Sequence, residues 1–233
     1  FPYTTLFRSK AFHTFKDHTI FERNELLTQS GGPYTVFTPY KNAWLRKVDA
    51  ARLAAWPVEP FAAALAPRPD WACTPVPSLA ALGLAAHDPP QRQRGGRKEG
   101  LRVLQDFLAE RSQGYRGGIS SPLTAPTACS RLSPYLALGC LGMREVVQAT
   151  QERQIQLKAD DEPLAPRQRQ GLAAFMSRMH WHCHFIQKLE SEPELEWRNL
   201  HRGYDGLREH DWNPAHFDAL QAGRTGWPMV DAC

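Results

Sequence analysis

The sequence predicts a short α/β part followed by a mainly α-helical part. Residues 10–48 combine apolar, β-rich and turn-forming segments with one helix start. Residues 49–96 are rich in Ala and Pro and show little periodicity, which is typical of a connection between domains. From residue 97 onward apolar residues recur at helical spacing and no strand pattern is found. We therefore expect an α/β end, a linker and a helical domain, in this order.

The first part holds one predicted turn and one predicted helix. A short apolar segment lies at residues 19–21, and the turn Ser-Gly-Gly-Pro follows at residues 30–33. Residues 34–37 are rich in β-forming side chains. Thr38 and Pro39 then predict a helix start, because a threonine hydroxyl can cap a helix and the φ of proline is already helical.

The helical part begins with a predicted helix over residues 97–113, which Gly114 is expected to end. Its apolar face consists of Leu101, Leu104, Phe107 and Leu108. A loop is predicted for residues 116–129. A serine and a proline then open a short helix over residues 133–139, with the serine as cap and a glycine at its end.

Two longer helices are predicted over residues 142–155 and 166–189. The second carries an apolar stripe at steps of four and three residues, which indicates one buried face. The stripe consists of Leu172, Met176, Met179, Cys183 and Ile186. Loops and short helices are predicted from there to Asn213 and Pro214, where another helix starts.

The composition is that of a folded cytoplasmic protein. The chain has 233 residues, 42% of them hydrophobic, which is enough to bury a core. No run approaches the roughly 18 apolar residues of a membrane span, and no signal segment opens the chain. The five cysteines are scattered, so reduced thiols are expected. Between Gln91 and Gly117 seven Arg/Lys face three Asp/Glu, which favours a polyanionic partner.

Both ends of the chain are expected to be artificial. The opening FPYTTLFRS resembles the translation of a common sequencing adapter, so residues 1–9 are expected to be non-native and the native sequence to start near Lys10. The chain begins without a methionine and stops at Cys233 inside an apolar stretch. We therefore expect further functional residues to lie outside it.

Three stretches of the sequence, in this order, resemble the photolyase/cryptochrome family. The first is GPYTVFTPY at residues 32–40 with Trp44, similar to the family's exit from its antenna domain. The second is Tyr115 with SRLSPYL at residues 130–136, similar to its flavin phosphate loop. The third is GRTGWPMVDA at residues 223–232, close to its GxTGxPxVDA signature. Their spacing is that of the family, and together they span nearly the whole chain.

The resemblance implies a fold and a domain organisation. Residues 10–48 would be the C-terminal end of a doubly wound α/β antenna domain, and residues 49–96 the interdomain linker. Residues 97–233 would be the first half of a mainly α-helical FAD-binding domain. The implied cofactor is FAD, and a folate or deazaflavin type of antenna chromophore is expected to bind outside this chain.

The resemblance also implies six cofactor-binding residues: Tyr115, Cys129, Ser130, Arg131, Leu132 and Ser133. The chemistry of this segment suits a diphosphate, because hydroxyls, a guanidinium and free amides at a helix start can all contact phosphate oxygens. Without the flanking stretches, the same segment suits a helix cap and a surface ion pair equally well. Cys129 replaces the threonine common in the family, so a backbone contact would survive there but a hydroxyl contact would not.

In DNA-repairing members of the family, the long helix presents a glutamate, a tryptophan and an arginine to the damaged base pair. The matching positions here are Arg178, Trp181 and His182, which share a helical face with Phe185. The resemblance implies that these four residues face DNA, where the tryptophan ring could stack on a flipped base. Arg178 cannot replace the glutamate as an acceptor or an acid. A divergent photolyase, a repair enzyme for another photoproduct and a signalling cryptochrome all stay open.

Our leading hypothesis is a photolyase-like flavoprotein, a carbon–carbon lyase that uses blue light and reduced FAD to repair pyrimidine photoproducts in DNA. The first alternative is a cryptochrome photoreceptor without repair activity. The second is a helical nucleic-acid-binding protein without flavin. No residue is assigned as catalytic, and a monomer without membrane contact is expected.

Four further positions complete the predictions. His180 and His184 are four residues apart on a helix and could share a zinc ion, but no partnering HxE or CxxC accompanies them, so packing at the flavin mouth is expected and no metal site. Arg224 is either a helix-start charge or a phosphate partner. Asp231 is expected to be a buried structural acceptor.

Overall fold

The computed structural model describes residues 16–54, 75–86, 88–89, 92–159 and 163–232. The expected non-native residues 1–9, the start near Lys10, much of the predicted linker, Cys73 and Cys233 lie outside the described residues. The chain divides into two compact units, Phe1–Lys188 and Leu189–Cys233.

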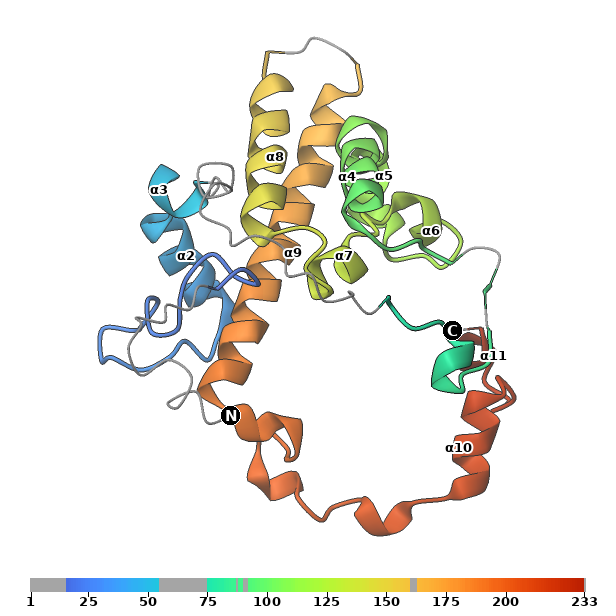
Figure 1. Cartoon of the computed structure of the whole chain (residues 1–233). Helices are drawn as coiled ribbons and strands as arrows, with labels where there is room; N and C mark the ends of the chain where they lie inside the picture. Colours follow the sequence, from blue (N-terminus) through green and yellow to red (C-terminus); the bar gives the residue numbers. More distant parts are fainter. Residues whose placement is uncertain (1–15, 55–74, 87, 90–91, 160–162, 233) are drawn as a thin grey trace, which may run out of the picture. The chain divides into compact units, whose positions relative to one another are not determined.

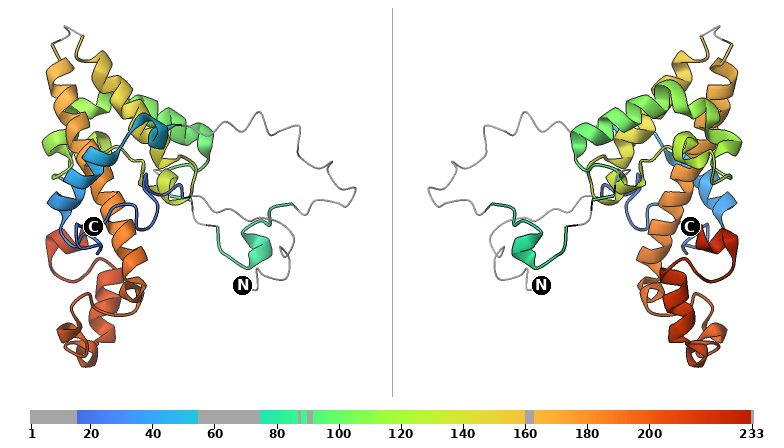
Figure 2. Two further views of the ribbon diagram at one scale, coloured as in Figure 1. Left: turned by 90° about the vertical axis from the view of Figure 1, so that its left-hand side faces the viewer. Right: turned by 90° about the vertical axis from the view of Figure 1, so that its right-hand side faces the viewer.

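The first unit is built from helices. They are α2 (Phe37–Lys47), α3 (Ala50–Leu53), a 3₁₀ turn (Ala80–Leu82), α4 (Arg97–Asp106), a π turn (Phe107–Arg111), α5 (Ser112–Gly118), α6 (Ala125–Ala128), α7 (Ser133–Ala137), α8 (Met143–Gln156) and α9 (Ala165–Ser191). The helices α8 and α9 run side by side, with α4 and α5 on one side of α9 and α2 on the other (Figures 1 and 2). The long helix α9 is therefore the central element of the unit.

The two longest helices confirm the periodicity of the sequence. The helix α8 begins after Gly142 and α9 begins at Ala165, each within one residue of its predicted start. Four residues of the predicted stripe on α9 are buried, and only Ile186 is half-buried. Gly139 has a φ of 66° directly after α7, where a residue without Cβ ends a helix at least cost.

One predicted helix end and two predicted caps are wrong. Gly114 does not end a helix, because it lies inside α5; the backbone leaves the helical conformation only at Arg116 and Gly117. Thr38 does not cap α2, which begins one residue earlier with Val36 as its N-cap and without a side-chain cap. In α7 the predicted cap serine is the first helical residue, and the predicted loop 116–129 contains the short helix α6.

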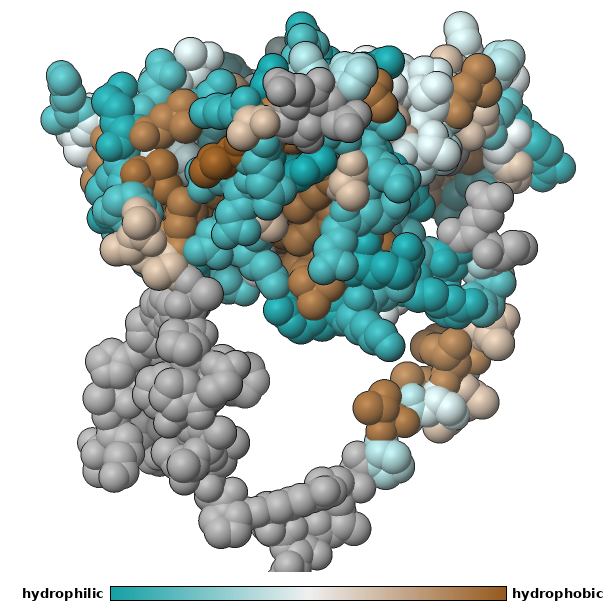
Figure 3. All heavy atoms as spheres, turned by 90° about the horizontal axis from the view of Figure 1, so that it is seen from above, coloured by the Kyte–Doolittle hydropathy of each residue, from teal (hydrophilic) through white to brown (hydrophobic). Residues whose placement is uncertain are grey.

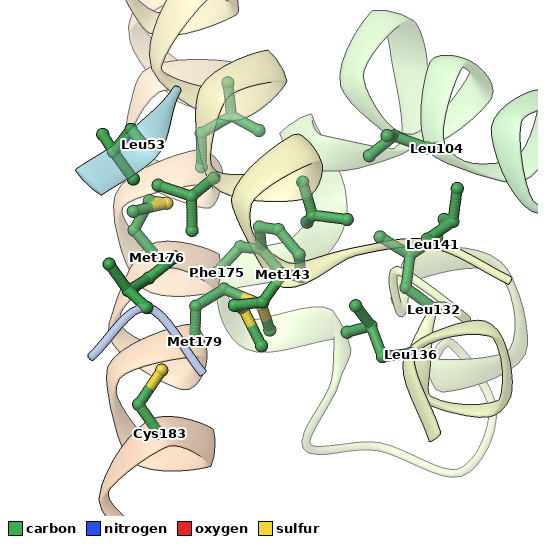
Figure 4. Close-up of a cluster of buried hydrophobic side chains, with 14 of the residues drawn as sticks. Leu53, Leu104, Leu132, Leu136, Leu141, Met143, Phe175, Met176, Met179 and Cys183 are labelled. Carbon is green, nitrogen blue, oxygen red and sulfur yellow. The ribbon is translucent and has the colours of Figure 1, made fainter. Parts of the chain in front are cut away.

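The described N-terminal residues share one hydrophobic core with the helices. Ile20, Phe21 and Trp44 belong to the same buried cluster as residues of α4, α8 and α9. Figure 4 shows part of this core, with the α9 side chains of Phe175 and Met179 pointing toward Met143 of α8. Burial of each such side chain stabilises the fold by roughly 1.5–3 kcal/mol. The core thus joins the two parts that the sequence analysis separates.

Polar contacts reinforce the same junction. The Arg144 guanidinium on α8 donates to the carbonyl oxygens of Arg52 (2.9 Å) and Lys16 (3.0 Å). No strand longer than the single bridge between Leu27 and Pro33 occurs among the described residues. The mainly helical prediction is thereby confirmed, and the α/β end stays a prediction.

The second unit consists of short turns and two helices, α10 (Pro214–Gln221) and α11 (Pro228–Asp231). Asn213 caps α10 by accepting hydrogen bonds from the next helical amides. Asp231 accepts three hydrogen bonds, from the amide and hydroxyl of Thr225 (2.7 and 2.6 Å) and from the amide of Gly226 (3.0 Å). These bonds, led by that of the Thr225 hydroxyl, lower the pKa of Asp231. The predicted acceptor role is confirmed, although the side chain is half-buried rather than buried.

The surface carries both hydrophilic and hydrophobic residues. Figure 3 shows one face on which hydrophilic residues surround smaller hydrophobic areas. Within the described residues, no helix is both long enough and apolar enough to cross a membrane.

Two helical segments approach each other closely at Gly171. A Cβ atom at this position of α9 would lie 1.7 Å from the carbonyl oxygen of Ser112, where α5 begins. Both residues are buried, so the absence of a side chain at Gly171 allows α5 to lie directly against α9.

We expect Gly171→Ala to lower the free energy of unfolding by about 2–3 kcal/mol, because a backbone oxygen cannot move aside without shifting a helix. Gly114→Ala is the matched control. There a Cβ would lie 3.7 Å from the Cβ of Ala128, an ordinary contact, so this change should be neutral or stabilising by roughly 0.5–1 kcal/mol. Urea unfolding of both variants measures the difference. Equal effects of the two substitutions would contradict the close approach.

Candidate cofactor site

An open cavity of about 630 Å³ lies between α5, the segment around α7 and the middle of α9. Its lining contains all six residues predicted to bind the cofactor: Tyr115, Cys129, Ser130, Arg131, Leu132 and Ser133. Two of the predicted DNA-facing residues, Arg178 and His182, line it as well. Segments distant in the sequence thus form a single pocket.

Aromatic rings form one wall of this cavity. Tyr115 and Phe175 meet edge to face with 5.7 Å between ring centroids, and Phe107 packs against both, at 5.5 and 4.8 Å. Burial raises the pKa of the Tyr115 hydroxyl, while the nearby Arg178 guanidinium and its hydrogen bond act in the opposite direction. The phenol is therefore neutral at physiological pH and fixed beside a cation.

The segment from Cys129 to Ser133, which we call the loop, forms the opposite wall. Arg131 has a φ of 60°, a left-handed conformation that costs a non-glycine residue about 1–3 kcal/mol. Its carbonyl oxygen accepts a hydrogen bond from Gln93 Nε2 at 2.8 Å. Within the described residues, no acceptor faces the backbone N–H groups of residues 130–133. The loop therefore offers unpaired donors to a ligand.

A residue that the sequence analysis missed holds this loop. Arg111 lies at the end of the π turn, and its guanidinium donates to the carbonyl oxygens of Cys129 and Ser130 (3.3 Å to the latter). The apolar spacing of residues 97–113 does not single out Arg111 as a residue that contacts the loop. The only available signal is an arginine next to the predicted apolar face of a helix.

The charge of the pocket favours an anion. Arg131 and Arg178 both line it, and no Asp or Glu belongs to its described lining. His182 adds a ring whose Nε2 lies 3.1 Å from the His18 carbonyl oxygen, and burial lowers the pKa of this imidazole. Two guanidiniums, hydroxyls and free amides without a competing carboxylate are the donor set that phosphate oxygens require.

Trp181 and Phe185 do not line this cavity. The Trp181 ring stacks on Phe37 of α2, with 3.7 Å between centroids and 9° between planes. Phe185 lies over Trp181 at 5.3 Å and 25°. The residues predicted to share one face of α9 therefore contact two different neighbourhoods, the cavity and the N-terminal helix α2.

The histidines of the same helix turn are packing residues. His180 is 4% exposed, and its ring lies 4.5 Å from that of Trp44. His184 is equally buried and packs against Tyr40 at 4.8 Å. In the part of the chain that the structure describes, no group of three or more His, Cys, Asp and Glu is arranged to hold a metal ion.

Comparisons with known proteins identify the relatives of this chain. The family model described as the FAD binding domain of DNA photolyase matches residues 175–233, and that described as DNA photolyase matches residues 7–63. A deoxyribodipyrimidine photo-lyase from Halobacterium salinarum is 30% identical over 219 residues, which are 94% of this chain and 43% of that protein. The chain belongs to the photolyase/cryptochrome family.

Two further relatives show the range of this family. The crystal structure of a class III photolyase from Agrobacterium tumefaciens superposes with a TM-score of 0.70 at 27% identity, over 93% of this chain and 42% of that one. A cryptochrome DASH from Gloeobacter violaceus is 27% identical over 184 residues, 76% of this chain and 34% of that protein. The chain thus spans less than half the length of these photolyase and cryptochrome relatives.

The buried histidines make the stability of this family member pH-dependent. Burial, with a smaller contribution from Lys41, lowers the pKa of His180 to about 4. Well above pH 6.5 the ring is neutral in both the folded and the unfolded chain, so His180 adds no pH dependence there. Between about pH 6.5 and 4 the unfolded chain binds more protons, so the free energy of unfolding falls as the pH falls, by about 3 kcal/mol in total.

We expect His180→Phe to remove this part of the pH dependence and leave the smaller contributions of His182 and His184 in place. The exposed His210→Phe is the control and should leave the curve unchanged. Unfolding by urea at intervals from pH 7.5 to 4.5 measures both. A His180→Phe variant whose stability falls as steeply as that of the parent chain would contradict the assignment.

Proposed function

We propose that this chain holds the diphosphate of FAD, as part of a blue-light flavoprotein. The observation that carries the proposal is the composition of the cavity: six predicted cofactor residues together with a second guanidinium, and no carboxylate in its described lining. The match of residues 175–233 to the photolyase FAD-binding domain supports the same cofactor.

The residues of the pocket fit a diphosphate in three ways. Arg131 and Arg178 supply positive charge from opposite walls, and Ser130 and Ser133 supply hydroxyls. The unpaired amides of the loop supply further donors, since no acceptor within the described residues faces them. The Tyr115 ring shields one side from water. Bound FAD supplies the light-driven electron transfer, and the protein supplies binding and orientation.

We propose repair of pyrimidine photoproducts in DNA, a carbon–carbon lyase reaction, as the activity of the complete protein. Relatives named deoxyribodipyrimidine photo-lyase support this reaction. The assignment of residues 10–48 to an antenna domain, 49–96 to a linker and 97–233 to the FAD domain belongs to the same proposal. A folate or deazaflavin antenna chromophore would bind outside this chain.

A photoreceptor without repair activity is the second candidate. The observation that favours it is the position of the predicted DNA-facing residues: Arg178 lines the cofactor cavity, and Trp181 stacks on Phe37. The cryptochrome DASH relative is compatible with this candidate. Damage-specific DNA binding separates the two.

Arg131→Ala should raise the dissociation constant of FAD about tenfold to a hundredfold, since a charge-assisted hydrogen bond contributes roughly 1.5–3 kcal/mol. Fluorescence titration with FAD measures the change. Arg102→Ala is the control, because Arg102 is an exposed arginine that pairs with Glu99 and does not line the cavity. Equal affinities of both variants would remove Arg131 from the site. Both variants are made in the complete protein, because this chain spans 43% of the length of its Halobacterium salinarum relative. Absence of saturable FAD binding to the complete protein would refute the flavin proposal.

If the protein repairs DNA, Trp181→Ala should lower its preference for ultraviolet-irradiated over intact duplex by about tenfold to a hundredfold. One face of the ring contacts Phe37, but Phe185 on the other face is 58% exposed and can move aside for a flipped base. Stacking of such a base contributes roughly 1–3 kcal/mol.

Phe37→Ala is the matched control for this change. It removes the same stacked pair and lowers stability, but it leaves the Trp181 ring for a base. The preference for irradiated duplex, the melting temperature and the flavin content are measured on both variants. A stable Trp181→Ala variant with unaltered preference would remove Trp181 from the DNA site. A parent protein without any preference would decide for the photoreceptor.

A further inference from the structure

Arg111 is the side chain with the most diverse contacts near the cavity, although it does not line it. Its guanidinium donates to Asp106 Oδ2 (2.5 Å) and to the carbonyl oxygens of Val103 (3.0 Å), Ser130 (3.3 Å) and Cys129. The guanidinium carbon also lies 5.5 Å from the centroid of the Phe107 ring. The side chain is only 18% exposed. Its geometry is therefore fixed from several sides.

These contacts determine which atoms of the loop are left for a ligand. Arg111 occupies the carbonyl oxygens of Cys129 and Ser130, and Gln93 occupies that of Arg131. Three consecutive oxygens are thus paired with protein donors, while no acceptor in the described residues faces the N–H groups of residues 130–133. An anion bound at the loop would therefore meet backbone N–H groups rather than unpaired carbonyl oxygens.

The same contacts hold a backbone conformation that an isolated loop would avoid. Arg131 has a left-handed φ, and the residue before it is fixed by Arg111. Left-handed non-glycine residues persist only where the surrounding structure determines them. Arg111 reaches the loop from a π turn, in which Arg153 pairs with the carbonyl oxygen of Leu108 (3.4 Å) and Gln168 with that of Ala109 (2.6 Å).

We propose that Arg111 is the positioning residue of the loop: it presets the anion-binding conformation of residues 129–133 and acts on the ligand only through them. This inference rests on the proposed function for the identity of the ligand. A lysine cannot take this role, because its single ammonium lacks the planar fork that reaches several carbonyl oxygens at once. Asp106, which precedes Arg111 in the chain, pairs with the same guanidinium that contacts the later loop.

The test compares Arg111→Met and Arg111→Lys with Arg153→Met. Arg153 is a half-buried arginine that holds the same π turn but makes no contact with the loop, so it is the matched control. The first readout is amide hydrogen exchange without ligand. Both Arg111 variants should exchange two amides at least about tenfold faster: that of Cys129, which donates to the Ala125 carbonyl oxygen (2.9 Å), and that of Leu136, which donates to the Leu132 carbonyl oxygen of the loop (3.0 Å). Exchange in α9 should stay unchanged. Arg153→Met should leave both amides as they are.

The second readout is a double-mutant cycle with FAD and inorganic diphosphate as probes. Arg111→Met should weaken both roughly tenfold in the complete protein and much less in an Arg131→Ala background, because the two arginines act through one loop. If Arg111 only stabilises the fold, the effects of Arg111→Met and Arg131→Ala on binding should add fully and amide exchange at the loop should stay unchanged. Either result overturns the inference. If neither probe binds the complete protein, the proposed function fails, and faster exchange of the two amides in the variants still supports Arg111 as the residue that orders the loop.

Discussion

The close contact of Gly171 with Ser112 determines how the rest of the site is built. A helix that carries a hydrogen in place of a side chain lets the neighbouring backbone approach to a distance that no other residue allows. Tyr115 follows Ser112 by one turn of α5, and Phe175 follows Gly171 by one turn of α9. Their rings therefore meet just beyond the contact, and the cavity opens where the two helices separate.

The π turn between α4 and α5 directly precedes Ser112 and depends on the neighbouring helices. An extra residue in a helical turn frees backbone carbonyl oxygens, which must find other donors when they are buried. Gln168 of α9 and Arg153 of α8 supply two of these donors, and Arg111 of the turn itself supplies a third to Val103. The irregular turn is thus stabilised by two helices and by its own arginine, which also reaches the loop.

Helix positions could be predicted from the sequence where residues within the helix or next to it determine its ends. The ends of α8 and α9 depend on glycine, proline and an apolar period, all of which lie within the helix or next to it. The six cofactor residues were found through their resemblance to a known loop, and the structure places them around one cavity. Gly114 was misjudged because a glycine can end a helix or lie inside one, and a Cβ there would make only an ordinary contact with Ala128 (3.7 Å). Arg111 left no periodic signal, since its partners lie on a loop that follows later in the chain.

The geometry of α9 also explains why the residues predicted to face DNA contact two different neighbours. Arg178 and Trp181 are three residues apart and lie near each other on α9, but a helix face is wide enough to meet two neighbours. On one side α5 and the loop approach Arg178, and on the other side α2 brings Phe37 against Trp181. A charge at residue 178 therefore acts on the electrostatics of the cavity, where it lowers the pKa of the Tyr115 hydroxyl against the effect of burial. An aromatic ring at residue 181 acts on the packing of α2 and on whatever contacts the exposed side of Phe185. Substitutions at the two positions should thus change the cavity and the packing of α2 independently, although both lie on one face of one helix.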